Sequence, residues 1–150
     1  MENKPTNELD SLLENIDMNH IKDYLEENKR YLADEKKEFY YYIKDVLYEK
    51  NIMLKDVYAF AGISSGFGSK IISMEKHTKD RDIIIRICVA GHFALNEINR
   101  ALKLYGMSEL YSKNPRDAVI IVAINKRKYN LYDIDEKLKE LGLKAIMPKE

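Results

Sequence analysis

Cysteine and histidine are scarce in this sequence of 150 residues, which has one cysteine, Cys88, and three histidines. A single thiol cannot close a disulfide within the chain, and so few scattered ligands argue against a zinc site. The apolar run from Ala118 to Ile124 has seven residues, well short of the roughly 18 that a membrane span needs. The first residues also lack the apolar stretch of a signal peptide. We therefore expect a cytoplasmic protein with no membrane segment, no bound metal and no other cofactor.

An excess of either charge is also lacking, because 25 basic side chains balance 25 acidic ones. Residues 1–38 carry 6 basic and 11 acidic side chains, residues 39–112 carry 10 and 8, and residues 113–150 carry 9 and 6. Overall neutrality argues against a strong nonspecific nucleic-acid binder and still allows a local basic face. We expect the acidic first segment either to lie across the mildly basic remainder or to recruit a basic partner protein.

Prolines and glycines interrupt the chain at only three and six positions, and apolar residues recur with helical spacing. From Leu9 to Ile16 they fall at i, i+3, i+4 and i+7, which predicts an amphipathic helix. A second helix is predicted from Ile21 with Asn19 as its N-cap, and a third helix after Asp34. The start of the chain is thus expected to form an acidic helical extension.

Two apolar runs, Ile83 to Val89 and Ala118 to Ile124, are rich in β-branched residues and have the composition of buried strands. Helices are favoured instead, because both runs belong to an internal repeat. Arg81-Asp82 and the aliphatic residues after it recur 35 positions later as Arg116-Asp117. Further on the offset is 36, and the matching pairs are Leu95 and Leu131, Ile98 and Ile134, Leu102 and Leu138, and Gly106 and Gly142.

The change of offset places one extra residue in the loop of the second copy. Each copy predicts a helix, a short loop and a second helix that ends at a glycine, as helix C-termini prefer. The 3.6-residue period of the second part is that of a helix. Two copies indicate a helical hairpin used twice rather than a solenoid, which needs at least three repeats.

The segment from Ile52 to Ser73 has the pattern of two short helices joined by a sharp turn. Gly62 supplies a residue that can take a positive φ at the turn, and Ser64 is expected to cap the second helix. The residues spaced to form the inner face of this segment are Val57, Ala61, Ile63 and Ile71.

This pattern resembles the lambda-repressor-like (Xre-type) helix-turn-helix family, and the likeness covers about residues 39–105. The resemblance implies a five-helix domain with helices at 39–51, 54–61, 65–73, 82–90 and 96–105, the third being the recognition helix. The wider layout is similar to a bacterial subgroup with an acidic N-terminal helical extension and a C-terminal helical hairpin. The expected fold is therefore all-α, with the extension over residues 1–38, the helix-turn-helix domain over 39–107 and the hairpin packed on it over 108–150.

Several positions depart from the family pattern. Met53 and Leu54 stand where a polar side chain usually reaches a phosphate. The recognition helix begins with Ser65 and Gly66 rather than with basic residues, and Met74 ends it in place of a glycine. The set of DNA contacts is therefore thinner than is usual in the family, whereas the pattern of the fold is retained.

The resemblance implies a transcriptional regulator that binds double-stranded DNA sequence-specifically, and such proteins commonly read two half-sites as homodimers. Small hydroxyls and lysines on a recognition helix or at its rim can reach base edges or phosphates. The side chains expected to contact DNA are Lys55, Ser64, Ser65, Gly66, Ser69, Lys70, Ser73 and Lys76. The alternative is that these residues are solvent-exposed helix positions that make no contact with DNA. For the densest basic run, residues 126–128, a role in solubility is favoured over a phosphate site.

The second hypothesis is a protein-interaction module, antitoxin-like or an adaptor, that keeps the fold with an eroded DNA surface. It would bind a partner protein through the acidic N-terminal arm or through the tyrosine-rich helix that follows it. An enzyme is not expected, because none of the histidines belongs to a recognisable catalytic arrangement. Cys88 lies on an apolar helix face and is expected to be an inert core residue.

One pair of residues departs from the family in a compensating way. Tyr58 stands four residues before Gly62, where a small residue is usual, and Gly68 stands six residues after it, where a core aliphatic is usual. Glycine within a helix costs about 1 kcal/mol relative to alanine, so its presence needs a reason. We predict that the Tyr58 ring crosses the helix pair and fills the space that Gly68 leaves.

Overall fold

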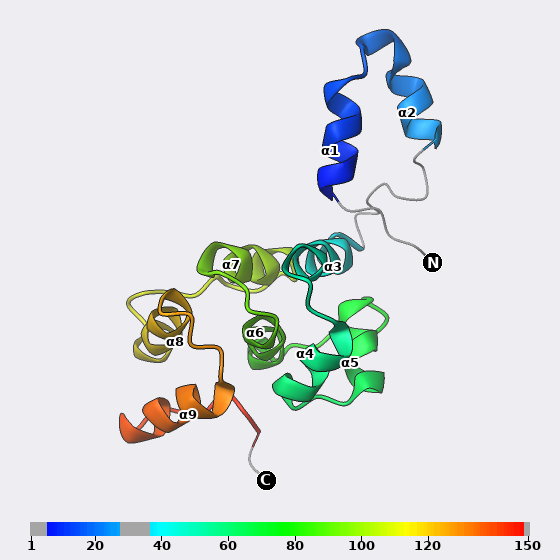
Figure 1. Cartoon of the computed structure of the whole chain (residues 1–150). Helices are drawn as coiled ribbons and strands as arrows, with labels where there is room; N and C mark the ends of the chain where they lie inside the picture. Colours follow the sequence, from blue (N-terminus) through cyan, green and yellow to red (C-terminus); the bar gives the residue numbers. More distant parts are fainter. Residues whose placement is uncertain (1–5, 28–36, 149–150) are drawn as a thin grey trace.

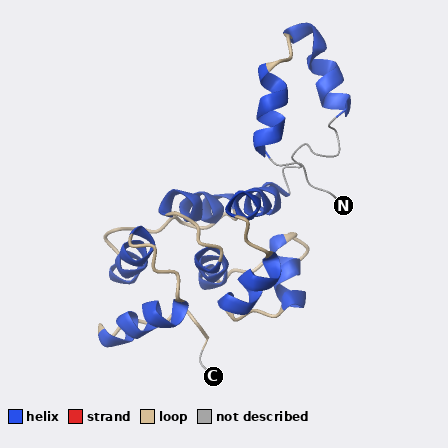
Figure 2. Ribbon diagram, viewed as in Figure 1, coloured by secondary structure: helices blue, strands red, loops and turns tan. Residues whose placement is uncertain are grey.

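The structure, a computed structural model, describes residues 6–27 and 37–148, and within these ranges every regular element is a helix (Figures 1 and 2). The all-α fold class is therefore confirmed, and both runs of strand-like composition lie in helices. The elements are α1 (Thr6–Glu14), the 3-10 helix η1 (Met18–His20), α2 (Ile21–Glu27), α3 (Glu38–Lys50), α4 (Leu54–Ala61), α5 (Ser65–Ile72), α6 (Arg81–Ala90), α7 (Leu95–Leu104), α8 (Pro115–Asn125) and α9 (Leu131–Glu140).

The capping residue predicted for the second helix is not the one that the structure uses. Asn19 lies inside η1, and its backbone N–H donates to the Asp17 carboxylate, which is the N-cap, at 3.0 Å. The prediction of Asn19 as the cap was wrong, because η1 precedes α2 directly and moves the first unpaired amides two residues upstream. Asp34 lies outside the described residues.

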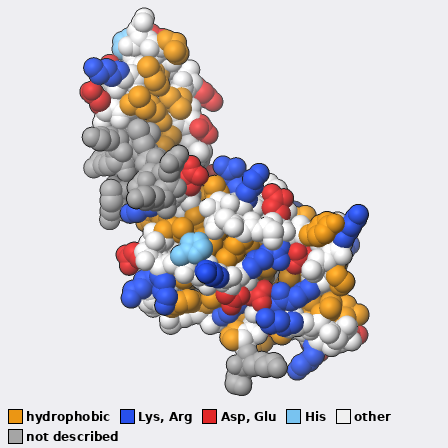
Figure 3. Space-filling view, turned by 180° about the vertical axis from the view of Figure 1, so that it is seen from behind, with side chains coloured by type: hydrophobic (Ala, Val, Ile, Leu, Met, Phe, Trp, Pro, Cys, Tyr) orange, Lys and Arg blue, Asp and Glu red, His pale blue; other side chains and the backbone are white. Residues whose placement is uncertain are grey.

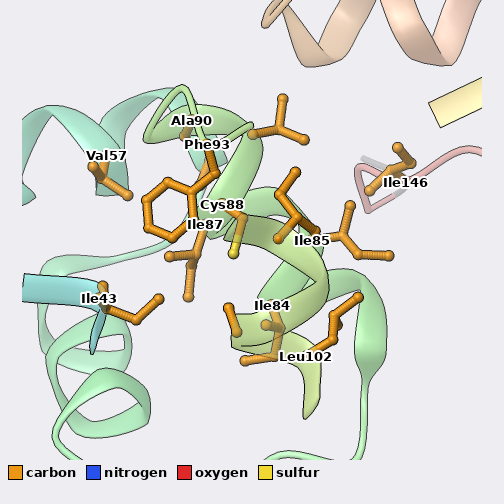
Figure 4. Close-up of a cluster of buried hydrophobic side chains, with 14 of the residues drawn as sticks. Ile43, Val57, Ile84, Ile85, Ile87, Cys88, Ala90, Phe93, Leu102 and Ile146 are labelled. Carbon is orange, nitrogen blue, oxygen red and sulfur yellow. The ribbon is translucent and has the colours of Figure 1, made fainter. Parts of the chain in front are cut away.

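Helix α6 lies at the centre of the fold, in contact with α4, α7 and α9. Its residues from Ile84 to Ala90 are all buried. In Figure 4, Ile43 of α3, Val57 of α4 and Leu102 of α7 surround this run. Cys88 within the run is fully buried, and burial raises the pKa of its thiol, as expected for an inert core residue. A helix enclosed on every side needs apolar residues around its whole circumference, which explains the strand-like composition of this segment, interrupted by Arg86.

The two helical hairpins, α6–α7 and α8–α9, are equivalent in structure, as the sequence repeat predicts. Their loops span residues 91–94 and 126–130, so the extra residue lies in the second loop. Each loop holds a left-handed non-glycine residue, His92 at φ 59° and Arg127 at φ 57°. Each second helix is followed by a left-handed glycine, Gly106 at φ 81° and Gly142 at φ 71°.

Two reciprocal ion pairs join the hairpins. The Arg81 guanidinium donates to both carboxylate oxygens of Asp117 at 3.0 Å, and the Arg116 guanidinium donates to both oxygens of Asp82 at 2.8 Å. The repeated Arg-Asp motif is thus used crosswise, since each arginine binds the aspartate of the other copy. Two parallel N–H···O bonds fix the relative orientation of the hairpins as well as their distance.

The same two arginines also hold the segment that follows the second helix of their own hairpin. Each donates to two adjacent backbone carbonyls, and the acceptors lie 36 positions apart: Ser108 and Glu109 in the first copy, Lys144 and Ala145 in the second. Asn99 and its counterpart Asp135 each accept a backbone N–H from the next residue, that of Leu110 and that of Ile146. The repeat therefore extends from the sequence to individual hydrogen bonds.

Candidate nucleic-acid interface

Helices α4 and α5 are joined by a tight turn whose local structure follows from three residues. Gly62 ends α4 in the left-handed conformation at φ 66°. The Ser64 hydroxyl accepts the N–H of Phe67 at 3.2 Å and so caps α5. Ile63 between them is half-buried against the core. These three predictions are confirmed, and so is the inner face, because Val57, Ala61 and Ile71 are fully buried.

The predicted exchange between Tyr58 and Gly68 is also confirmed. The Tyr58 side chain is buried, with 7% of the residue exposed, and Gly68 is buried beside it. A Cβ atom placed on Gly68 would lie 2.5 Å from two carbon atoms of the Tyr58 ring. The ring therefore occupies the volume that any larger residue at position 68 would need, and it fixes α5 against α4.

A buried arginine holds the turn from the core side. Arg86 projects from the centre of α6, and its guanidinium donates to the carbonyl oxygens of Ala61 at 2.9 Å and Gly62 at 3.0 Å. Burial lowers the pKa of this guanidinium, and the two carbonyls supply the partners that a buried cation requires. Sequence reasoning missed this residue. The sequence feature that could have identified it is a single charged residue inside the apolar run of α6.

The outward face of α5 carries four of the eight residues expected to contact DNA. Ser65, Gly66, Ser69 and Lys70 are exposed, and no atom lies within 4 Å of a Cβ placed on Gly66. Ser73 is only half-buried and its hydroxyl donates to the Lys70 carbonyl oxygen at 3.3 Å. The structure thus brings four of the predicted residues to one open helix face, with Ser73 at the end of the helix and turned toward its backbone.

The predicted rim residues lie at either side of this face. Lys55 is exposed near the start of α4. Lys76 follows α5 in a loop that folds back, because its N–H donates to the Lys70 carbonyl oxygen at 3.1 Å and its ammonium lies 5.2 Å from the centre of the Phe67 ring. Exposed acids, Asp56 and Glu75, stand next to these lysines in the chain. The rim is therefore of mixed charge rather than strongly basic.

Two large apolar side chains are exposed on the α4 side of the motif. Phe60 is 67% exposed and Met53, directly before α4, is 59% exposed. Neither can bind a phosphate, and a large apolar side chain in water favours contact with another apolar surface. The α4 side of the motif is thus less suited to a DNA backbone than the face of α5.

The three histidines each contact a neighbouring side chain. His77 and His92 stack on Tyr105 and Tyr129 with ring centres 4.4 and 4.5 Å apart, and His20 binds the nearby carboxylate that caps η1. Among the described residues, no group of three or more His, Cys, Asp or Glu side chains is placed to hold a metal ion. None of the helices in these ranges combines the length and hydrophobicity needed to cross a membrane.

Comparison with models of protein families, with curated proteins and with solved structures finds no match to this chain. The resemblance to the Xre-type family stays a prediction from the residues of the sequence.

Proposed function

We propose that this protein is a sequence-specific DNA-binding regulator of transcription, in which α4, the turn and α5 act as a helix-turn-helix and α5 is the recognition helix. The observation that carries the proposal is the open outward face of α5, next to a turn held by Arg86. A recognition helix must be rigidly attached, and its outward side chains must be free to meet base edges in the major groove. The Tyr58 ring holds α5 at Gly68, and Ser65 and Lys70 on its outward face are exposed. The Ser69 hydroxyl donates to the Gly66 carbonyl oxygen at 3.1 Å.

The bounds of five consecutive helices support the same proposal. Helices α3 to α7 each begin and end within one residue of the ranges that the family resemblance implies. On this proposal they form the helix-turn-helix domain, α1 and α2 belong to an acidic extension, and α8 and α9 form a hairpin packed on the domain.

The small side chains of α5 define how it would approach the duplex. Ser65 and Gly66 at its start allow the helix backbone to come close to the edges of the bases, and serine hydroxyls can donate or accept a hydrogen bond there. Lys70 is the one charged side chain of α5, and it suits the O6 and N7 acceptors of guanine. Lys55 and Lys76 at the rim would bind backbone phosphates.

The proposal is tested by selecting binding sites from a random duplex library and measuring affinity for the selected site by fluorescence anisotropy. Lys70→Ala should weaken specific binding by about 1–3 kcal/mol. Lys76→Ala should weaken all duplexes alike and lower the log–log salt slope by about 0.9. The matched control is Lys103→Ala, which removes an exposed lysine of α7. Unchanged affinity of Lys70→Ala for the selected site would exclude its role.

A second candidate function is a protein-interaction module, antitoxin-like or an adaptor, and the exposed Phe60 and Met53 favour it. On this proposal the fold is a scaffold and the acidic arm or the α4 side binds a partner protein. Failure of the wild-type protein to bind any duplex at low salt would favour this function over the first. Both proposals place the protein in the cytoplasm, and neither assigns it a catalytic step or a cofactor.

A further inference from the structure

The second hairpin carries an apolar groove between α8 and α9. Its volume is about 820 Å³. Val122 and Leu141 in its wall are 57% and 58% exposed, which is unusual for large apolar residues that face each other across a groove. The lining residues that matter below are Val122, Lys126, Asp133, Glu136, Lys137 and Leu141.

The internal repeat shows what such a groove accepts, because α3 occupies the equivalent place on the first hairpin. The Phe39 ring of α3 lies 4.7 Å from that of Tyr105, and the Lys50 ammonium lies 2.9 Å from the Glu97 carboxylate. Four residues of the first hairpin are covered by α3 in this way: Tyr105, Glu97, Arg100, whose guanidinium lies over the Tyr42 ring, and Gly91, whose Cβ position meets Leu47. Their counterparts at offsets of 36 or 35 are Leu141, Asp133, Glu136 and Lys126, and all four line the groove.

We propose that the groove binds helix α1 from a second copy of this chain. Helix α1 has no buried residue, and Leu12 and Leu13 on it are each 41% exposed. Figure 3 shows hydrophobic side chains gathered on the arm that α1 and α2 form. Each of the two surfaces therefore presents apolar side chains to water that contact with the other would bury.

Charge complementarity supports this choice of occupant. Residues 6–27 contain seven Asp and Glu side chains and one lysine. Relative to the first hairpin the groove gains Lys126, Lys128 and Lys137 in place of Gly91, Phe93 and Ala101, and Glu136 replaces Arg100, so that three lysines and two acids line it. An acidic helix is attracted to such a groove, and a basic helix is repelled.

The direction of α3 on the first hairpin also gives the direction of the bound helix. Helix α3 begins beside Tyr105 and ends beside Glu97. In the same direction, Leu9 of α1 would lie over Leu141, and the chain after it would run toward the end of the groove that holds Lys126 and Asp133. Leu9 thus meets the apolar end of the groove.

The arm of a second copy is the occupant because the arm of the same chain is held elsewhere. The Thr6 hydroxyl donates to the Asp45 carboxylate of α3, and in Figure 1 α1 lies beyond α3, at the opposite end of the molecule from α8 and α9. When two copies each place α1 in the other's groove, the two contacts are identical and the assembly closes as a two-fold dimer. This inference does not depend on DNA binding.

Sedimentation equilibrium of the full-length chain tests the dimer over a range of concentrations. Leu13→Glu and Val122→Glu should each raise the dimer dissociation constant by roughly tenfold or more, because each buries an unpaired carboxylate. Tyr132→Glu is the matched control, since Tyr132 is a 67% exposed residue of α9 that is not part of the groove wall. A chain that stays monomeric throughout, or a dimer that Tyr132→Glu weakens as much as Val122→Glu does, would overturn the proposal.

Disulfide cross-linking then shows whether the α1 helix in the groove comes from a second copy or from the same chain. Leu13→Cys protein mixed with Val122→Cys protein should form a cross-linked heterodimer under mild oxidation, whereas Leu13→Cys mixed with Tyr132→Cys should not. The native Cys88 does not interfere because it is fully buried. If the cross-link forms only within single chains that carry both substitutions, the arm occupies its own groove and the proposal of a second copy is wrong.

Discussion

Helices α6 and α8 hold equivalent places in the two hairpins, and their surroundings differ. In α6 every residue from Ile84 to Ala90 is buried, whereas in α8 only Asp117, Ile120 and Ile124 are. The crossed Arg–Asp pairs and the bonds from each arginine to two backbone carbonyls are nevertheless the same in both copies. The difference arises from α3 and α4, which pack on the first hairpin. The polar bonds thus define the hairpin, and the helices around it decide how much of its apolar surface is covered.

The largest expected effect comes from breaking the crossed ion pairs one at a time. Asp117→Ala should destabilise the fold by about 3–5 kcal/mol, because it leaves the Arg81 guanidinium and the N–H of Tyr111 without their buried partner. Asp82→Ala should cost about 1–3 kcal/mol, since the Asp82 side chain is 13% exposed against 6% for Asp117 and pairs with Arg116 alone. Urea denaturation measures both. Equal losses would show that the two pairs are equivalent in energy as well as in geometry.

Truncating equivalent residues of α6 and α8 tests the difference in covering. Ile87 is 1% exposed and its counterpart Val122 is 57% exposed. Ile87→Ala should cost about 2–5 kcal/mol of unfolding free energy, whereas Val122→Ala should stay within about 0.5 kcal/mol. Denaturation at a protein concentration low enough to keep the chain monomeric makes the comparison. A large loss for Val122→Ala under those conditions would show that the groove is covered within one chain.

Two glycines of α5, one buried against α4 and one exposed, give a matched pair of substitutions. Gly68→Ala should destabilise by about 1–3 kcal/mol, because the new methyl group overlaps the Tyr58 ring. Gly66→Ala should be neutral or stabilising by up to about 1 kcal/mol, since it meets no atom and improves helix propensity. Thermal denaturation of both variants is sufficient. A Gly68→Ala protein as stable as the parent would mean that the ring moves aside at little cost.

The smallest expected effect is the contribution of one carboxylate to the loss of unfolding free energy at acid pH. Burial alone would raise the pKa of Asp117, but the hydrogen bonds from Arg81 and Tyr111 outweigh it and hold this pKa below its usual value. A depressed pKa contributes stability that is present above the unfolded value of about 3.9 and is lost as the pH falls through the folded value. The unfolding free energy of Asp117→Asn should therefore fall less steeply below about pH 4 than that of the parent. Parallel curves would assign the acid sensitivity to other carboxylates.

Residue spacing predicted the parts of this fold that depend on neighbours in the chain. The helices, the repeat with its extra loop residue and the capping by Ser64 all follow from local preference and period. Even the contact of Tyr58 with Gly68 could be predicted, because both residues lie in one motif with two anomalies of size. The prediction of Asn19 as the N-cap was wrong because a short 3-10 helix precedes α2 and moves the unpaired backbone N–H groups upstream.

Interactions between distant segments could not be predicted in the same way. The Arg-Asp motif was visible in both copies, but nothing in a period shows that Arg81 binds Asp117 rather than a residue of its own copy. Arg86 was visible only as a charge in an apolar run. The groove could not be predicted from the sequence either. Its exposure depends on which helices cover which hairpin, and that is a property of the assembled fold.

The most direct test of the proposed function maps amide chemical shifts of the nitrogen-labelled protein during titration with a selected duplex. The account predicts that the largest changes fall on Ser65 to Lys70 in α5 and on the rim lysines, with little change in the groove between α8 and α9. Changes confined to the basic loop at residues 126–128, with α5 unaffected, would contradict it, because the duplex would then be bound without its proposed recognition helix.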